Sequence, residues 1–206
     1  TQALSADTLG SRSVAIGHQA LNTQNFTSGT ITYQTAVGYD AGANITTGLE
    51  NTLVGYGAGD ALTDADYNVA LGVASLSTDT LGSRSTAIGY GTLTQQNFTS
   101  ATDAYNVAVG HAAGGGVTTG VQNTLIGGLA GDAITNAANT VAIGYAALTA
   151  DTKGYGSVAV GNAALETQNF TSNTDTYNTA VGYYAGNDIT TGVENTLLGG
   201  AAGDAL

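Results

Sequence analysis

The phrase Asn139-Thr140-Val141-Ala142-Ile143-Gly144 decides the fold, because related phrases recur at regular intervals along the chain. Each version contains two small or aliphatic residues, an aliphatic residue and then a glycine, which we call the marker glycine. The markers delimit 17-residue and 21-residue units, and the order of units between Gly17 and Gly89 is repeated between Gly89 and Gly161. This internal repetition predicts a stack of similar structural units. The eleven markers are Gly17, Gly38, Gly55, Gly72, Gly89, Gly110, Gly127, Gly144, Gly161, Gly182 and Gly199.

The 21-residue units all carry the same insert, which reads Gln-Asn-Phe-Thr-Ser at residues 24–28, 96–100 and 168–172. A tyrosine follows each copy, and the inserts hold the only phenylalanines of the chain. A repeated phenylalanine either covers the core or forms an exposed knob. We expect a cover, because repeated exposed aromatic side chains promote association. The phenylalanines are Phe26, Phe98 and Phe170, and the tyrosines that follow the inserts are Tyr33, Tyr105 and Tyr177.

The residues before each marker have the composition of a short strand. Counting from the marker, position −1 is always aliphatic, −2 is Ala or Leu, −3 is Val or Thr, and −4 is polar. Alternation places −1 and −3 on one face and −2 on the other, so both faces are apolar or small. This favours parallel pairing with packing on both faces. Helices are disfavoured, because glycine and threonine are frequent and no 3.6-residue stripe is sustained.

The residues after each marker supply a second apolar position. Position +4 is Leu in some units and Gly in the others, and the Gly units place an aliphatic residue at +7. We expect a second, shorter strand there, with turn residues filling the rest of the coil. The six aliphatic residues are Ile45, Leu62, Val117, Ile134, Ile189 and Leu206.

The predicted fold is therefore an all-β parallel β-solenoid of 17- and 21-residue coils. Residues 1–206 form one repeat array of about twelve coils, with super-repeats at approximately 1–72, 73–144 and 145–206. The chain begins without Met and both ends fall inside a coil, so we expect a segment of a longer fibre protein. Asparagine occupies −4 in six units, and we expect these side chains to stack as a ladder.

Composition excludes several classes of function. The chain has 3 Lys plus Arg against 15 Asp plus Glu, a formal net charge of −12, and no cysteine. Nucleic acids and anionic membranes both require basic residues, so neither is a predicted partner. No apolar run is long enough to insert into a membrane as a helix. The sequence predicts no disulfide, no metal site and no cofactor.

Two histidines and five tyrosines share position +1, immediately after a marker. They are His18, Tyr39, Tyr56, Tyr90, His111, Tyr145 and Tyr183. They predict either a contact stripe for a host glycan or protein, since aromatic side chains give large contact area at low entropic cost, or packing between chains. The two histidines lie several coils apart and have no repeat-breaking nucleophile beside them, so we predict no catalytic residue.

The acidic residues also follow the repeat. Asp60, Asp132 and Asp204 share one position, and Asp7, Asp79 and Asp151 share another. Equivalent acids are about four layers apart, which is too far for them to converge on one calcium ion. We expect them to cap turns and to keep the protein soluble.

The repeats resemble the head repeats of YadA-type trimeric autotransporter adhesins. They resemble still more closely the Asn-Thr-Ala-Ile-Gly-Tyr-x-Ala-Leu arrays of phage tail-fibre-like proteins. The matching phrases are residues 139–148, 178–186 and 85–93. The resemblance implies a left-handed parallel β-roll, three chains packed side by side, and an extracellular fibre or adhesin segment on a cell surface or virion. Both kinds of coil in this chain are longer than those typical of adhesin heads.

The Ala/Leu face supports a homotrimer indirectly. One roll has one interior, so we expect the −2 face to lie on the trimer axis, with Leu53, Leu125 and Leu197 as its bulkiest layers. Exposed coil ends would also allow an end-to-end filament. The predicted function is a non-enzymatic fibre segment that presents contacts to a host. The alternative is a monomeric ice- or surface-binding solenoid, suggested by recurrent Thr-Thr pairs, and an enzyme ranks last.

Overall fold

The structure is a computed structural model, and it describes residues 2–204. Every regular element in these residues is a β-strand, no helix is present, and the parallel strands form a β-solenoid of about eleven turns. The chain divides into two compact units, unit 1 (residues 1–105) and unit 2 (residues 106–206). The predicted all-β solenoid is confirmed. Leu206, which we expected in the last coil, lies outside the described residues.

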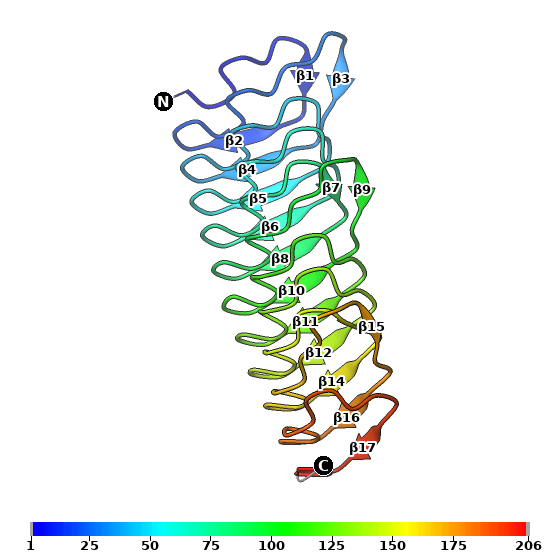
Figure 1. Cartoon of the computed structure of the whole chain (residues 1–206). Helices are drawn as coiled ribbons and strands as arrows, with labels where there is room; N and C mark the ends of the chain where they lie inside the picture. Colours follow the sequence, from blue (N-terminus) through cyan, green and yellow to red (C-terminus); the bar gives the residue numbers. More distant parts are fainter. Residues whose placement is uncertain (1, 205–206) are drawn as a thin grey trace. The chain divides into compact units, whose positions relative to one another are not determined.

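In unit 1, each turn contributes one three-residue strand to a parallel ladder, and each strand ends at position −1. Residues of equal position face each other, so that Ala36 pairs with Leu53 and Leu53 pairs with Ala70. Figure 1 shows these strands one above another. They are β2 (Val14–Ile16), β4 (Thr35–Val37), β5 (Thr52–Val54), β6 (Val69–Leu71) and β8 (Thr86–Ile88).

Unit 2 repeats the same construction. Ala108 pairs with Leu125, and Ala180 pairs with Leu197, again in parallel and in register with the repeat. Residues at the same position relative to the marker therefore pair whether the turn has 17 or 21 residues. The strands are β10 (Val107–Val109), β11 (Thr124–Ile126), β12 (Val141–Ile143), β14 (Val158–Val160), β16 (Thr179–Val181) and β17 (Thr196–Leu198).

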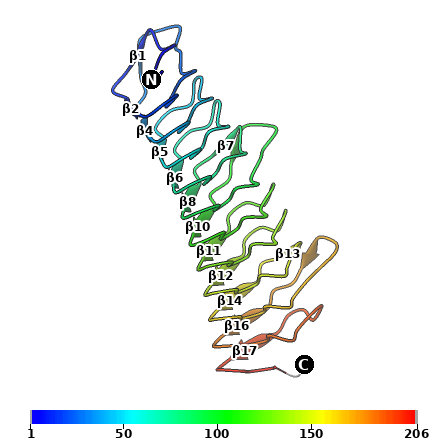
Figure 2. The same cartoon turned by 90° about the vertical axis from the view of Figure 1, so that its left-hand side faces the viewer.

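In residues 2–204, a second strand occurs only in each insert turn and in the turn before it, and these two strands pair with each other. Two-residue parallel pairs form between β1 (Gly10–Ser11) and β3 (Thr30–Ile31), β7 (Gly82–Ser83) and β9 (Thr102–Asp103), and β13 (Gly154–Tyr155) and β15 (Thr174–Asp175). Figure 2 shows the insert turn of unit 2 reaching beyond its neighbours, beside the label of β13. Our prediction of a strand at the +7 aliphatic residues is wrong. Ile45 and its equivalents are buried, but they lie in irregular backbone.

The interior of each unit is lined by the face that we had assigned to a trimer axis. Ala36, Leu53 and Ala70 at position −2 are fully buried. The aliphatic residues at −1 point outward, and Ile16 is 60% exposed. The sequence-based assignment of the two faces is therefore reversed. The physical reason is volume, because the lumen of a short turn also receives Leu at +4 or an aliphatic residue at +7, which leaves room mainly for alanine at −2.

The markers are glycine because adjacent turns meet there. Gly55 has a φ of +140°, and a Cβ added to it would lie 2.3 Å from the carbonyl oxygen of Gly72 in the next turn. Real Cβ atoms do not approach oxygen so closely, and L-residues rarely adopt that φ. Only glycine is compatible with both constraints.

The predicted asparagine ladder is present in both units. Asn68 Nδ2 donates to the Gly82 carbonyl (2.9 Å), and the Ser85 N–H donates to Asn68 Oδ1 (2.8 Å). Asn51 makes the same two kinds of bond one turn earlier. In unit 2, Asn106 and Asn123 do likewise. Each buried amide therefore satisfies backbone groups of the following turn.

Buried side chains and hydrogen bonds attach the insert to the roll. Phe26, Phe98 and Phe170 are at most 7% exposed, which confirms that they cover the core. Beside Phe98, the fully buried Asp79 accepts hydrogen bonds from the N–H groups of Gly82 (3.0 Å) and Phe98 (3.2 Å). The expected turn-capping role of this acid is confirmed, but the expectation that it keeps the protein soluble is wrong, because its side chain is fully buried. Gln96 Nε2 adds a third bond to the same carboxylate, at 2.6 Å.

Candidate functional site

The outward face of each strand ladder is apolar and carries no charge. We call the −1 residues on this face the aliphatic stripe. Leu71 in unit 1 is 45% exposed, and Ile126 in unit 2 is 37% exposed. The stripe is Ile16, Val37, Val54, Leu71 and Ile88 in unit 1, and Val109, Ile126, Ile143, Val160, Val181 and Leu198 in unit 2.

A second outward column runs beside the aliphatic stripe at position −3. It contains only valine and threonine, for example Thr35, Thr52 and Val69 on consecutive turns of unit 1. These side chains are partly or fully exposed. Each ladder thus presents two regular rows of small or aliphatic side chains at the spacing of the turns, roughly 4.8 Å.

The +1 residues form a third outward column, which we call the aromatic column. In unit 1, His18 stacks on Tyr39 with 4.9 Å between ring centroids and 10° between ring planes. Tyr39 stacks on Tyr56 at 5.5 Å and 18°. The structure therefore brings three of the predicted contact residues together. Because their faces cover one another, they offer mainly ring edges to solvent. Tyr90, in the same column, is 59% exposed.

In unit 2 the aromatic column is interrupted. His111, Tyr145 and Tyr183 are exposed, with Gly128 between the first two and Asn162 between the last two. The rings of Tyr183 and Tyr184 pack edge to face, at 4.4 Å between centroids and 67° between ring planes. The pKa of the Tyr184 hydroxyl is raised, first by the neighbouring charge of Tyr183 and then by a hydrogen bond with it.

Sequence reasoning missed a cluster at the corner where an insert turn meets the two turns before it. Arg84 lies 4.7 Å from the ring centroid of Tyr67 and 5.8 Å from that of Tyr105. Its Nε donates to Asp103 Oδ1 at 2.9 Å. Arg12 occupies the equivalent position one super-repeat earlier and donates to the Tyr33 hydroxyl (2.7 Å). The recurrence of arginine at one fixed distance before tyrosine was the available signal. These contacts of arginine with tyrosine and aspartate stabilise the corner of the roll at which they lie.

Two carboxyl groups in unit 1 are partly buried and interact. Oδ1 of Asp40 and Oδ1 of Asp60 are both buried and without a hydrogen-bond partner in residues 2–204. Burial raises the pKa of Asp60, and the charge of Asp40 raises it further. No group of three or more His, Cys, Asp or Glu side chains able to hold a metal ion occurs in the described residues.

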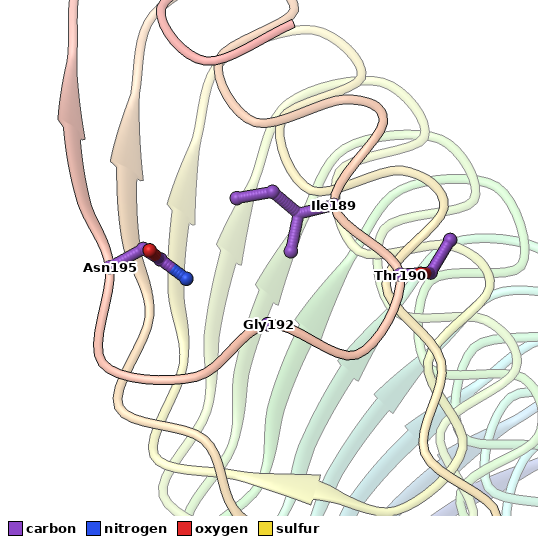
Figure 3. Close-up of a pocket in the computed structure, with 4 residues that line it drawn as sticks. All are labelled: Ile189, Thr190, Gly192 and Asn195. Carbon is purple, nitrogen blue, oxygen red and sulfur yellow. The ribbon is translucent and has the colours of Figure 1, made fainter. Parts of the chain in front are cut away.

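A hollow of about 260 Å³ lies at the last described turn of unit 2. Figure 3 shows that Ile189 and Asn195 point into it, whereas Thr190 points away. Gly192 completes the lining. One aliphatic side chain and one amide are fewer converging groups than a small-molecule site normally has. We therefore assign no ligand to this hollow.

Comparison with known proteins finds no matching family model, no similar curated protein and no similar solved structure. Among residues 2–204 there is also no helix with the length and apolar character that a membrane crossing requires. Function must therefore be argued from the geometry of the outward columns.

Proposed function

We propose that this chain is a non-enzymatic segment of an extracellular fibre or adhesin, displayed on a cell surface or a virion. In the proposed assembly, three left-handed rolls pack side by side through the aliphatic stripe. The aromatic column remains at the edge of this contact, where it presents rings to a host glycan or protein. Neither a cofactor nor a catalytic group is part of the proposal. The rolls could also stack end to end through their terminal coils and so form a filament.

The observation that carries this proposal is the exposure of the aliphatic stripe on successive turns. A monomeric protein rarely exposes a continuous apolar patch of this kind, and such patches mark interaction surfaces. Burying a Val or Ile side chain contributes about 1.5–3 kcal/mol, so a contact repeated on each turn adds up over the array. The resemblance to trimeric adhesin and tail-fibre repeats sets the expected number of chains at three.

The test is the solution mass of the chain by light scattering. We expect three times the chain mass of 20.3 kDa. Ile126→Glu places a charge on the exposed stripe, so it should reduce the mass to that of one chain without unfolding the roll. The matched control is Thr119→Glu, at an exposed position in a bend of the same unit, which should leave the trimer intact. A wild-type mass of one chain would contradict the assembly.

A second candidate is supported by the same face. The −3 column places threonine beside the aliphatic stripe on a regular, uncharged sheet, as at Thr35 and Thr52. This arrangement favours an ice- or surface-binding solenoid acting as a monomer. Thermal hysteresis measured on the single-chain species distinguishes the two functions. Hysteresis that disappears in Thr35→Lys would support the second candidate, and its absence in the wild-type chain removes it.

A further inference from the structure

The aromatic column of unit 2 contains a gap at Asn162. Backbone bonds place Tyr145, Asn162 and Tyr183 on consecutive turns, since Ala163 N–H donates to the Tyr145 carbonyl (2.9 Å) and Tyr184 N–H donates to the Asn162 carbonyl (3.0 Å). The same kind of bond links His18, Tyr39 and Tyr56 in unit 1. In unit 1, each of these turns contributes a ring. In unit 2, the middle turn contributes an amide.

The spacing of the turns leaves room for one additional ring above Asn162. Adjacent rings of the unit 1 column have their centroids 4.9 and 5.5 Å apart. Tyr145 and Tyr183 are two turns apart, a distance of roughly 9.6 Å. A ring placed between them needs about 3.5–4 Å on each side. Two turns of the roll are therefore far enough apart for a single six-membered ring to fit between them.

The interruptions of the column at Gly128 and Val73 have no polar side chain. At Gly128 an added Cβ would lie 3.4 Å from the ring of Tyr145, so that ring covers the glycine. In unit 1, the turn between Tyr56 and Tyr90 carries Val73, whose side chain has no group that could bond a sugar hydroxyl. Among these three positions, only Asn162 carries a polar side chain.

We propose that the gap at Asn162 binds one pyranose ring of a neutral glycan. This deepens the proposed function, on which it rests, by naming the ligand class and the site. The tyrosine faces suit the C–H surface of a sugar ring, because aromatic faces carry negative partial charge. The Asn162 amide offers both donors and an acceptor for sugar hydroxyls. The net charge of −12 disfavours acidic sugars.

Polar groups beside the gap fit the same ligand. Glu166 Oε2 accepts a hydrogen bond from Asn187 Nδ2 at 2.7 Å. The charge of Glu166 also contributes to the raised pKa of Tyr184, whose ring touches Tyr183. A carboxylate near the aromatic pair provides acceptors for the hydroxyl groups of a sugar, which a partner's aromatic side chain could not use.

The experiment is saturation-transfer NMR on the full chain with chitotetraose, cellotetraose and maltotetraose at millimolar concentration. We expect transfer to at least one of them. Asn162→Tyr completes the ring stack, as in unit 1, and should abolish transfer. Tyr183→Ala should weaken binding roughly tenfold by removing one face of the site. Tyr177→Ala removes an exposed tyrosine of unit 2 that lies outside the aromatic column; it is the matched control and should leave the affinity unchanged.

Three results would overturn the proposal. They are no transfer to any of the neutral tetrasaccharides, transfer that persists in Asn162→Tyr, and preferential binding of phenol over sugars. Light scattering on the same samples reads the assembly separately. Loss of sugar binding with a three-chain mass rejects the glycan site alone. A one-chain mass with sugar binding retained rejects the trimer alone.

Discussion

The asparagine at position −4 shows how one residue connects two turns of the roll. Its amide replaces main-chain partners that a tight corner cannot supply, because a corner breaks the strand ladder. In Asn68, the acceptor oxygen serves the N–H of Ser85, and the donor nitrogen serves the carbonyl of Gly82. Both groups are buried, so neither has water as an alternative partner.

Asn68→Ala should therefore destabilise the protein by about 2–4 kcal/mol, because two buried backbone groups lose their partners. Urea denaturation followed by circular dichroism measures the change. The control is Asn97→Ala, which removes an exposed amide that accepts one bond from Thr80 Oγ1 and should cost less than about 0.5 kcal/mol. Equal losses in the two variants would show that the ladder does not bear on stability.

The raised pKa of Asp60 predicts that the stability of the protein depends on pH. Burial raises the pKa of its carboxyl above the ordinary value of 3.8, and Asp40 adds to this. The folded state thus holds the proton more tightly than the unfolded state. The stabilising contribution is full below the unfolded pKa and is lost as pH rises through the folded pKa. Asp60→Asn should gain stability relative to wild type between about pH 3 and about pH 7. A difference in urea midpoints that stays constant over this range would contradict the assignment.

At the scale of one turn, the apolar side chain that fills the core comes from position +4 in some turns and from position +7 in the others. Turns with Leu at +4, such as the one containing Leu76, carry a polar residue at +7. Turns with Gly at +4 carry an aliphatic residue at +7 and in some cases Leu at −2. A Cβ at Gly59 would lie 2.8 Å from Leu53 and 2.9 Å from Leu62. Each turn therefore places a similar apolar volume in the lumen by a different route.

A buried pair of polar side chains, Asp79 and Gln96, joins an insert turn to the turn before it, and exchanging the two residues tests this pair. Asp79→Asn turns an acceptor toward Gln96 into a donor, so two N–H groups oppose each other. We expect a loss of about 2–3 kcal/mol. The double variant Asp79→Asn with Gln96→Glu restores one donor and one acceptor across the pair, so it should recover most of the stability in thermal melts. A double variant less stable than Asp79→Asn would reject the pairing.

Periodicity predicted the elements well, but it could not orient them. The marker spacing located every three-residue strand, and the burial of Ile45 and Phe98 followed from the repeat. Alternation alone does not say which face is inside when both faces are apolar. The lumen selected the small −2 residues and left Ile16 and Leu71 outside. The sequence alone also did not predict the gap at Asn162, because the gap depends on which side chains the neighbouring turns place beside it.

At the scale of the whole chain, charge and apolar surface act in opposite directions. The chain has a formal net charge of −12, with 3 basic residues against 15 acidic ones. Three such chains in contact repel one another over distances comparable to the Debye length. The proposed interface contains no charged residue, so its attraction is hydrophobic and nearly independent of salt.

The proposed trimer should consequently become more stable as salt is added. Raising NaCl from about 0.01 M to about 0.5 M shortens the Debye length from roughly 30 Å to under roughly 10 Å, which weakens the repulsion and leaves the aliphatic contact in place. Sedimentation velocity at low protein concentration should show more three-chain species at the higher salt. Ile126→Glu should stay a single chain at both concentrations, because a buried unpaired charge is not relieved by screening. Dissociation of the wild-type trimer by salt would instead indicate an interface of ion pairs. The outward columns hold no such pairs in residues 2–204, so the contact would then have to lie on another face of the roll.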